Sequence, residues 1–171
     1  LLLTAPLLSL GAANAAEPTS AYTKFNLKKC KTIEQGDQGA SWSCKGLKGY
    51  SLYVAEGDLR MMIGYGKNYN EQRASSQTLG PFNSLFEKDH KTTLEWRLAD
   101  GVPYATIVRY ETQSDASGTM VTGQVLVVAK VGAKNGTDAC HVAHIDALAN
   151  SDANELARKA ADELAAKLDR K

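Results

Sequence analysis

The chain has 171 residues, of which 43% are hydrophobic and 23% are charged, and its formal net charge at pH 7 is +1. This composition excludes a disordered chain and a long coiled coil, and the near-zero net charge argues against a dedicated nucleic-acid-binding protein. A chain of this length suits one domain with a real hydrophobic core.

The first predicted element is a signal peptide over residues 1–15. The chain opens with the uncharged run L-L-L-T-A-P-L-L-S-L-G-A-A-N-A-A. An apolar stretch that gives way to small residues matches the apolar region and A-x-A cleavage site of secretory signals. We expect cleavage after Ala15, with Ala16 as the alternative. A short membrane anchor is the other interpretation, but the apolar part is shorter than the about 20 residues that span a bilayer.

The rest of the chain has no other apolar stretch of spanning length. We therefore expect no membrane span and a protein exported to the bacterial periplasm. Residues 16–171 are predicted to form a single α+β domain. Residues 16–24 are polar and include one proline, so we expect them to be a flexible N-terminal tail.

Three cysteines fit an oxidising compartment when two of them pair. Cys30 and Cys44 flank the turn-rich stretch E-Q-G-D-Q-G-A, which can bring two strands together. The predicted disulfide contributes on the order of 3 kcal/mol in the chain-entropy model, and two buried free thiols are the alternative. Cys140 then remains as a small buried side chain or as a cross-link between two chains.

A lysine-rich patch is predicted around the disulfide, where only Glu34 and Asp37 oppose the positive charge. Such a patch attracts an anionic partner, for example a cell-wall polymer, lipid headgroups or an acidic protein. The alternative is a solvated basic face, which is the usual role of a charge run. The candidate binding residues are Lys28, Lys29, Lys31, Lys45 and Lys48, with Lys24 beside them.

Two hairpins are expected in the middle of the chain. S-L-Y-V-A and L-R-M-M-I-G-Y flank E-G-D and predict one of them. Asp100-Gly101 predicts a two-residue turn within residues 92–112, because both of its positions favour positive φ. Counting outward from this turn pairs Trp96 with Ala105 on an apolar face, and it leaves Arg97 on a partly wet face.

Asn135-Gly136 predicts a further turn, after a strand that is apolar on both faces around Val128. Counting outward pairs Val128 with Ala143 and Ala129 with Val142. The strand after the turn therefore begins in the stretch D-A-C-H-V-A-H-I-D.

That stretch contains Cys140, His141 and His144, which form a candidate thiol or metal site. On a regular strand the two histidines point to opposite faces, and Cys140 lies about 13 Å from His144. Because metal–ligand bonds are only about 2 Å long, this stretch alone is not expected to hold a metal. A helix, or a further ligand such as His90, would change that conclusion.

The last predicted element is an amphipathic helix, with a capping box formed by Asp152 and Glu155. Its apolar stripe consists of Leu156, Ala160, Leu164 and Leu168, with alanines beside them. The fold prediction is an antiparallel β-meander of about six strands with this helix packed on the sheet. A helix on a membrane surface is the alternative, although the polar face is mixed in charge rather than basic.

The chain lacks the familiar catalytic signatures, including C-x-x-C, H-E-x-x-H, a P-loop, S-x-x-K and G-x-S-x-G. We therefore predict a non-catalytic periplasmic binding or interaction protein, envelope-related or inhibitor-like, a monomer or weak dimer without metal or cofactor. Its partner is expected to be a protein or an anionic envelope component. The first alternative is a hydrolase or a thiol or metal enzyme that uses His141, His144 or Cys140. The second is a small-ligand carrier with a pocket between helix and sheet.

The C-terminal run C-H-V-A-H-I-D-A-L-A-N-S-D-A-N-E-L-A-R-K-A-A-D resembles the end of a family of small exported alphaproteobacterial proteins. Their closing segments are similar to C-H-V-A-x-x-D-A followed by A-N-x-x-A-R-x-x-A-D, and V-A-E-G-D-L-R matches more loosely. The resemblance implies export and the fold, but no activity. It also implies a cysteine after the helix that pairs with Cys140, whereas K-L-D-R-K contains none.

Overall fold

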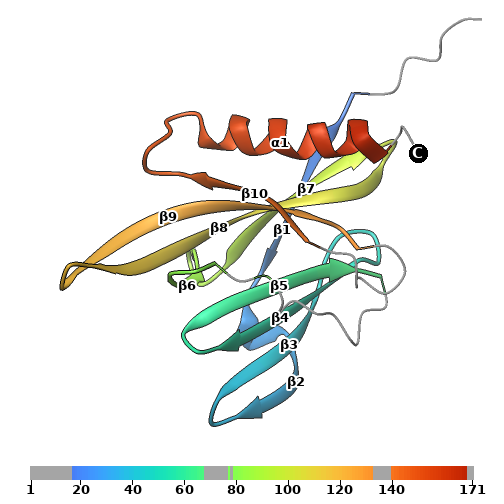
Figure 1. The fold of residues 1–171 in the computed structure, drawn as a ribbon. Helices are drawn as coiled ribbons and strands as arrows, with labels where there is room; N and C mark the ends of the chain where they lie inside the picture. The colour runs from blue at the N-terminus through green and yellow to red at the C-terminus, as the bar shows by residue number, and fades with distance from the viewer. Residues whose placement is uncertain (1–16, 68–76, 78, 133–139, 169–171) are drawn as a thin grey trace, which may run out of the picture.

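The computed structural model describes residues 17–67, 77, 79–132 and 140–168. Within these ranges the chain forms three layers, a helix above a larger sheet and a smaller sheet below it (Figure 1). This arrangement confirms the predicted α+β class and the C-terminal helix on an antiparallel sheet. The predicted signal peptide and the predicted Asn135-Gly136 turn lie outside the described residues.

The larger sheet is a four-stranded meander with two additions. Its consecutive strands β7, β8, β9 and β10 pair antiparallel, β1 pairs with β7 at one edge, and β6 pairs with β8 beyond the start of β7. Their bounds are β1 (Thr19–Phe25), β6 (Phe82–Leu85), β7 (Thr92–Ala99), β8 (Val102–Ala116), β9 (Thr119–Lys130) and β10 (His141–Asp146). Because β9 pairs with a strand on either side, the prediction of a central strand in this region is confirmed.

The smaller sheet is a second antiparallel meander, in the order β2-β3-β4-β5. Its strands are β2 (Lys31–Gly36), β3 (Gly39–Lys45), β4 (Ser51–Gly57) and β5 (Arg60–Gly66). The hairpin predicted around E-G-D is present as β4 and β5, and Asp58 and Leu59 form its turn with φ angles of 50° and 59°. A short 3-10 helix, η1 (Leu27–Lys29), connects β1 to this sheet.

The helix α1 (Ala153–Leu168) packs on the larger sheet through its smallest side chains. Ala157 and Ala161 are fully buried against the sheet, whereas Leu156 of the predicted stripe is only half-buried. Alanine has no side chain beyond Cβ, so the helix axis comes close to the strands. The predicted contact is therefore confirmed, with its centre shifted to the alanine side of the stripe.

The prediction of a flexible tail over residues 16–24 is wrong from Thr19 onward. Thr19 to Phe25 form β1, which pairs with β7 along its length. The alternation in T-S-A-Y-T-K-F turns Thr23 and Phe25 inward, and the Thr23 hydroxyl accepts a hydrogen bond from the Trp96 indole at 2.9 Å. Polar composition concealed a strand whose alternate residues contact the core.

The predicted register of the β7–β8 hairpin is wrong by one residue. Trp96 pairs with Thr106 instead of Ala105, because the pairing shifts between Arg97 and Leu98. The irregularity lies beside Pro103, which has no N–H for a regular ladder and is tolerated at bulges. Arg97 does not lie on a partly wet face either, because α1 covers it: Asp162 of the helix binds its guanidinium, and only 7% of the Arg97 surface is exposed.

Candidate functional site

The predicted disulfide between Cys30 and Cys44 is formed. It links the end of η1 to β3, so it ties the segment after β1 to the smaller sheet. The Asn26 side chain caps η1 by accepting a hydrogen bond from the Lys28 backbone N–H at 2.9 Å. The local fold of this corner is therefore set by one covalent bond and one cap.

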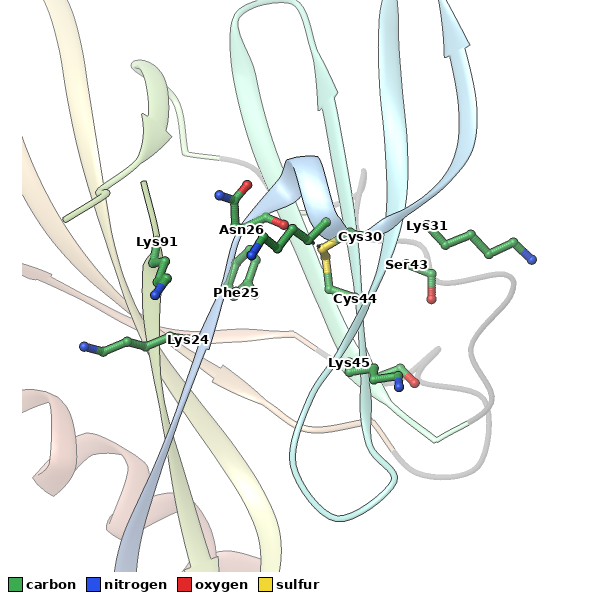
Figure 2. Close-up of a pocket in the computed structure, with 11 residues that line it drawn as sticks. Lys24, Phe25, Asn26, Cys30, Lys31, Ser43, Cys44, Lys45 and Lys91 are labelled. Atoms are coloured by element: carbon green, nitrogen blue, oxygen red, sulfur yellow. Dashed lines mark hydrogen bonds between the residues drawn. A yellow bond between two sulfur atoms is a disulfide. The ribbon is translucent and has the colours of Figure 1, made fainter. Parts of the chain in front are cut away.

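A pocket of about 660 Å³ opens beside the disulfide. Its walls contain five lysines, and none of the described lining residues is Asp or Glu. Figure 2 shows Lys24 and Lys91 on one side of the disulfide and Lys31 and Lys45 on the other. The lining residues are Lys24, Phe25, Asn26, Lys29, Cys30, Lys31, Ser43, Cys44, Lys45, Ser51 and Lys91.

The five lysines reach the pocket from different elements. Lys24 lies near the end of β1, Lys29 in η1 and Lys31 at the start of β2, while Lys45 ends β3. Lys91 comes from the turn before β7 and is brought near by the pairing of β1 with β7. The site therefore exists only when both sheets and the connection between them are formed.

The charge of this pocket is not neutralised within the described parts of the chain, where no ion pair joins any of its five lysines to a carboxylate. Buried Phe25 and Cys44 give it an apolar floor, and Ser43 and Ser51 add hydroxyl groups to its wall. Ammonium groups and hydroxyl groups around a hollow can bind carboxylate, phosphate or sulfate groups.

The structure brings together three of the five predicted patch lysines, Lys29, Lys31 and Lys45. Lys28 is exposed on η1 and is not among the lining residues. Lys48 donates a hydrogen bond to the Gly101 carbonyl at 2.9 Å, in the turn between β7 and β8, so it lies apart from the pocket. The sequence did not predict that Lys91 lines the pocket, because no local sequence pattern indicates that β1 pairs with β7.

A second, smaller cleft of about 320 Å³ borders the first and shares Lys91 with it. Lys88, Arg109 and Arg158 line it together with Glu95. Glu95 is already bound by Arg158, with 2.7 Å between the Arg158 Nε and the carboxylate. The excess positive charge of the pocket therefore continues toward the start of α1.

Cys140, His141 and His144 lie together at the other end of the chain, where β10 begins. Cys140 is a free, half-buried cysteine whose carbonyl accepts a hydrogen bond from the Lys130 backbone N–H. Contrary to the prediction, the two histidines do not point to opposite faces, because Nδ1 of His141 lies 2.9 Å from Nε2 of His144. Within the described residues no group of three or more His, Cys, Asp or Glu side chains is placed to hold a metal ion.

The cause is a register shift between His141 and Ala143. Ala143 pairs with Val128 as predicted, but Ala129 pairs with His141 instead of Val142. The extra residue in β10 changes the alternation, so His141 returns to the face of His144.

Among the described residues, no helix combines the length and the apolar character that crossing a bilayer requires.

No protein-family model, curated protein or solved structure matches this chain. The resemblance of its C-terminal run to exported alphaproteobacterial proteins therefore stays a prediction.

Proposed function

We propose that this protein is an exported, non-catalytic binding protein that holds an anionic partner in the lysine-lined pocket. The observation that carries the proposal is the convergence of five lysines from separate elements on one hollow without an acidic residue among its described lining. Like charges held together repel each other and weaken the fold. A bound anion relieves this repulsion. Anion binding therefore accounts for the convergence of the lysines, which a merely solvated surface would not require.

The dimensions and surroundings of the pocket favour a partner with several negative charges along its length. A volume of about 660 Å³ accommodates more than a single phosphate or carboxylate. Lys91 also lines the adjoining cleft, so an extended anion can continue from one hollow into the next. A polymeric or surface-borne anion of the cell envelope fits this arrangement.

The disulfide supports the proposed location, because such bonds persist in oxidising compartments such as the periplasm. It also keeps Lys29 and Lys31 next to Lys45, since it joins the segments that carry them. Reducing this bond is expected to weaken anion binding by loosening the pocket.

The test compares two doubly substituted proteins with the same loss of charge. Lys45→Gln with Lys91→Gln alters the pocket, whereas Lys159→Gln with Lys167→Gln alters α1, away from the described lining residues. Binding is measured by titration with inorganic polyphosphate and by sedimentation with phosphatidylglycerol vesicles, at several salt concentrations.

We expect the pocket variant to lose roughly tenfold in affinity, because exposed charge pairs contribute about 0.2–1 kcal/mol each. The helix variant is expected to bind nearly as well as the original protein. Equal weakening in both variants would mean that only net charge matters, and the proposal would be wrong. Preference for polyphosphate or for vesicles tells a soluble polymer from a membrane surface.

A small-ligand carrier is the second candidate, favoured by the apolar floor and the volume of the same pocket. The predicted location between helix and sheet corresponds to the smaller cleft of about 320 Å³, which Asn154 and Arg158 of α1 line together with Ile107 and Leu126 of the sheet. A native mass spectrum of protein isolated from the periplasm would show a bound small molecule. A compound that is lost in the Lys45→Gln variant would favour the carrier.

The enzyme alternative concerns Cys140, His141 and His144. Once an activity is found, Cys140→Ala and His144→Ala would test it, because a thiol or imidazole mechanism does not survive loss of the reacting group.

A further inference from the structure

The two histidines of β10 lie on the same face of the strand and contact each other through their ring nitrogens. His141 pairs with Ala129 and His144 pairs with Val127, and both partners belong to the core between the two sheets. Residues paired directly across antiparallel strands lie on the same side of a sheet. The bulge therefore places two imidazoles side by side at the margin of that face, with ring centroids 5.0 Å apart.

The spacing of the two nitrogens matches one type of metal coordination. With metal–nitrogen bonds of about 2 Å, ligands at a right angle lie about 2.8–2.9 Å apart, whereas tetrahedral ligands lie about 3.3 Å apart. Nδ1 of His141 and Nε2 of His144 are separated by 2.9 Å. Tetragonal sites with nitrogen and oxygen ligands are typical of Cu²⁺ and Ni²⁺.

We propose that His141 and His144 form a two-imidazole chelating site for a divalent copper ion. His141 coordinates through Nδ1 and His144 through Nε2, and water fills the remaining positions. This site is independent of the anion-binding proposal, because its residues do not line the lysine pocket. In the exported protein the site would hold a copper ion at the surface, exchangeable with solvent.

Without metal, the same two nitrogens share a hydrogen bond, in which one ring donates and the other accepts. On coordination, the donated proton moves to the other nitrogen of its own ring.

The chain offers a matched control, because its three histidines include His90, which lies in the exposed turn between Lys88 and Lys91. We would titrate tag-free protein with Cu²⁺ in a Cys140→Ser background, since a free thiol next to His141 can be oxidised by copper. Affinity is measured by calorimetry, and the bound nitrogens are counted by electron paramagnetic resonance. The variants are His141→Gln, His144→Gln and His90→Gln.

We expect one copper ion with two imidazole nitrogens, and a loss of at least about tenfold in affinity in His141→Gln or His144→Gln, because a second tethered ligand acts at high effective concentration. His90→Gln should bind like its parent. His144 is exposed, so its replacement leaves the core intact and keeps the test decisive even when His141→Gln does not fold. Equal affinity in His144→Gln and in the parent, or a spectrum with one imidazole nitrogen, would show that the pair is only a hydrogen bond.

Discussion

The two faces of the larger sheet are buried by different means. On the side of the smaller sheet, the core contains large side chains, among them Trp96, Tyr65 and Tyr110, which are at most 2% exposed. The rings of Trp96 and Tyr65 meet edge to face at a centroid distance of 6.1 Å. On the helix side, α1 contributes alanines that pack against Ile107, Leu126 and Val128 of the sheet, and a network of charged groups lies beside them.

That network joins α1 to the strands below it. Arg97 donates to Asp162 through Nε at 2.9 Å and through Nη2 at 2.7 Å, and the Tyr104 hydroxyl donates to the same carboxylate at 2.7 Å. Burial would lower the pKa of Arg97, but the hydrogen bond and charge of Asp162 outweigh it and raise the pKa. Arg158 and Ser20 both donate to Glu95, so the network also reaches β1.

Buried apolar surface and directional ion pairs contribute differently to this fold. Large apolar side chains stabilise the contact between the sheets in proportion to the surface they bury. Alanines bury little, and a paired buried charge adds little net stability but is costly to leave alone. The ion pairs therefore determine where the helix lies more than how strongly it is held.

The largest expected effect follows from removing the central indole. Trp96→Ala deletes a fully buried side chain and its hydrogen bond to Thr23, so we expect a loss of about 3–5 kcal/mol in the free energy of unfolding. Urea unfolding followed by circular dichroism measures the change. Trp42→Ala, at a half-buried tryptophan, serves as the control, and an equal loss in both variants would contradict the central position of Trp96.

The second prediction concerns the helix side. Asp162→Ala leaves the Arg97 guanidinium buried without its carboxylate, and we expect a loss of about 2–3 kcal/mol, below the usual 3–5 because Asp162 is partly exposed. Replacing both groups, with Arg97→Met added to Asp162→Ala, should recover more than half of that loss. A double variant as unstable as the sum of the two single changes would argue against the coupling.

The third and smallest effect is a dependence on pH that arises from His141, at the margin of the core between the two sheets. The pKa of His141 is about 4 in the folded protein, below its ordinary value of 6.5. The unfolded state therefore binds the proton more readily than the folded state. The contribution of neutral His141 to the stability of the fold is present above pH 6.5 and is lost as the pH falls toward 4. Thermal unfolding midpoints at pH 7.5 and pH 5 should differ less in His141→Gln than in the original protein. An unchanged difference would place the responsible group elsewhere.

Local patterns were sufficient for much of the fold. The E-G-D turn, the disulfide between Cys30 and Cys44, and the apolar periodicity of the helix all depend on neighbours in sequence, and each predicted an element that is present. Of the five lysines predicted near the disulfide, Lys29, Lys31 and Lys45 line the pocket, whereas Lys28 and Lys48 do not.

The wrong predictions concern strand register and the pairing of strands that are far apart in the sequence. The two bulges shift the pairing of Trp96 and of His141 by one residue, and one residue is enough to exchange the faces of a strand. Counting from a turn assumes a regular ladder, so it could not bring His141 next to His144. The contribution of Lys91 to the pocket likewise depends on β1, which was predicted to be a flexible tail because its composition is polar.

The position of β1 has a consequence for the order in which the molecule folds. Ser20 contacts Glu95, which is 75 positions later in the chain. During synthesis from the N-terminus, β1 therefore has no partner until β7 has been made, while the strands of the smaller sheet can already pair with their sequence neighbours. The first strand to be made therefore has to wait for β7, and until then its edge is exposed to wrong pairing.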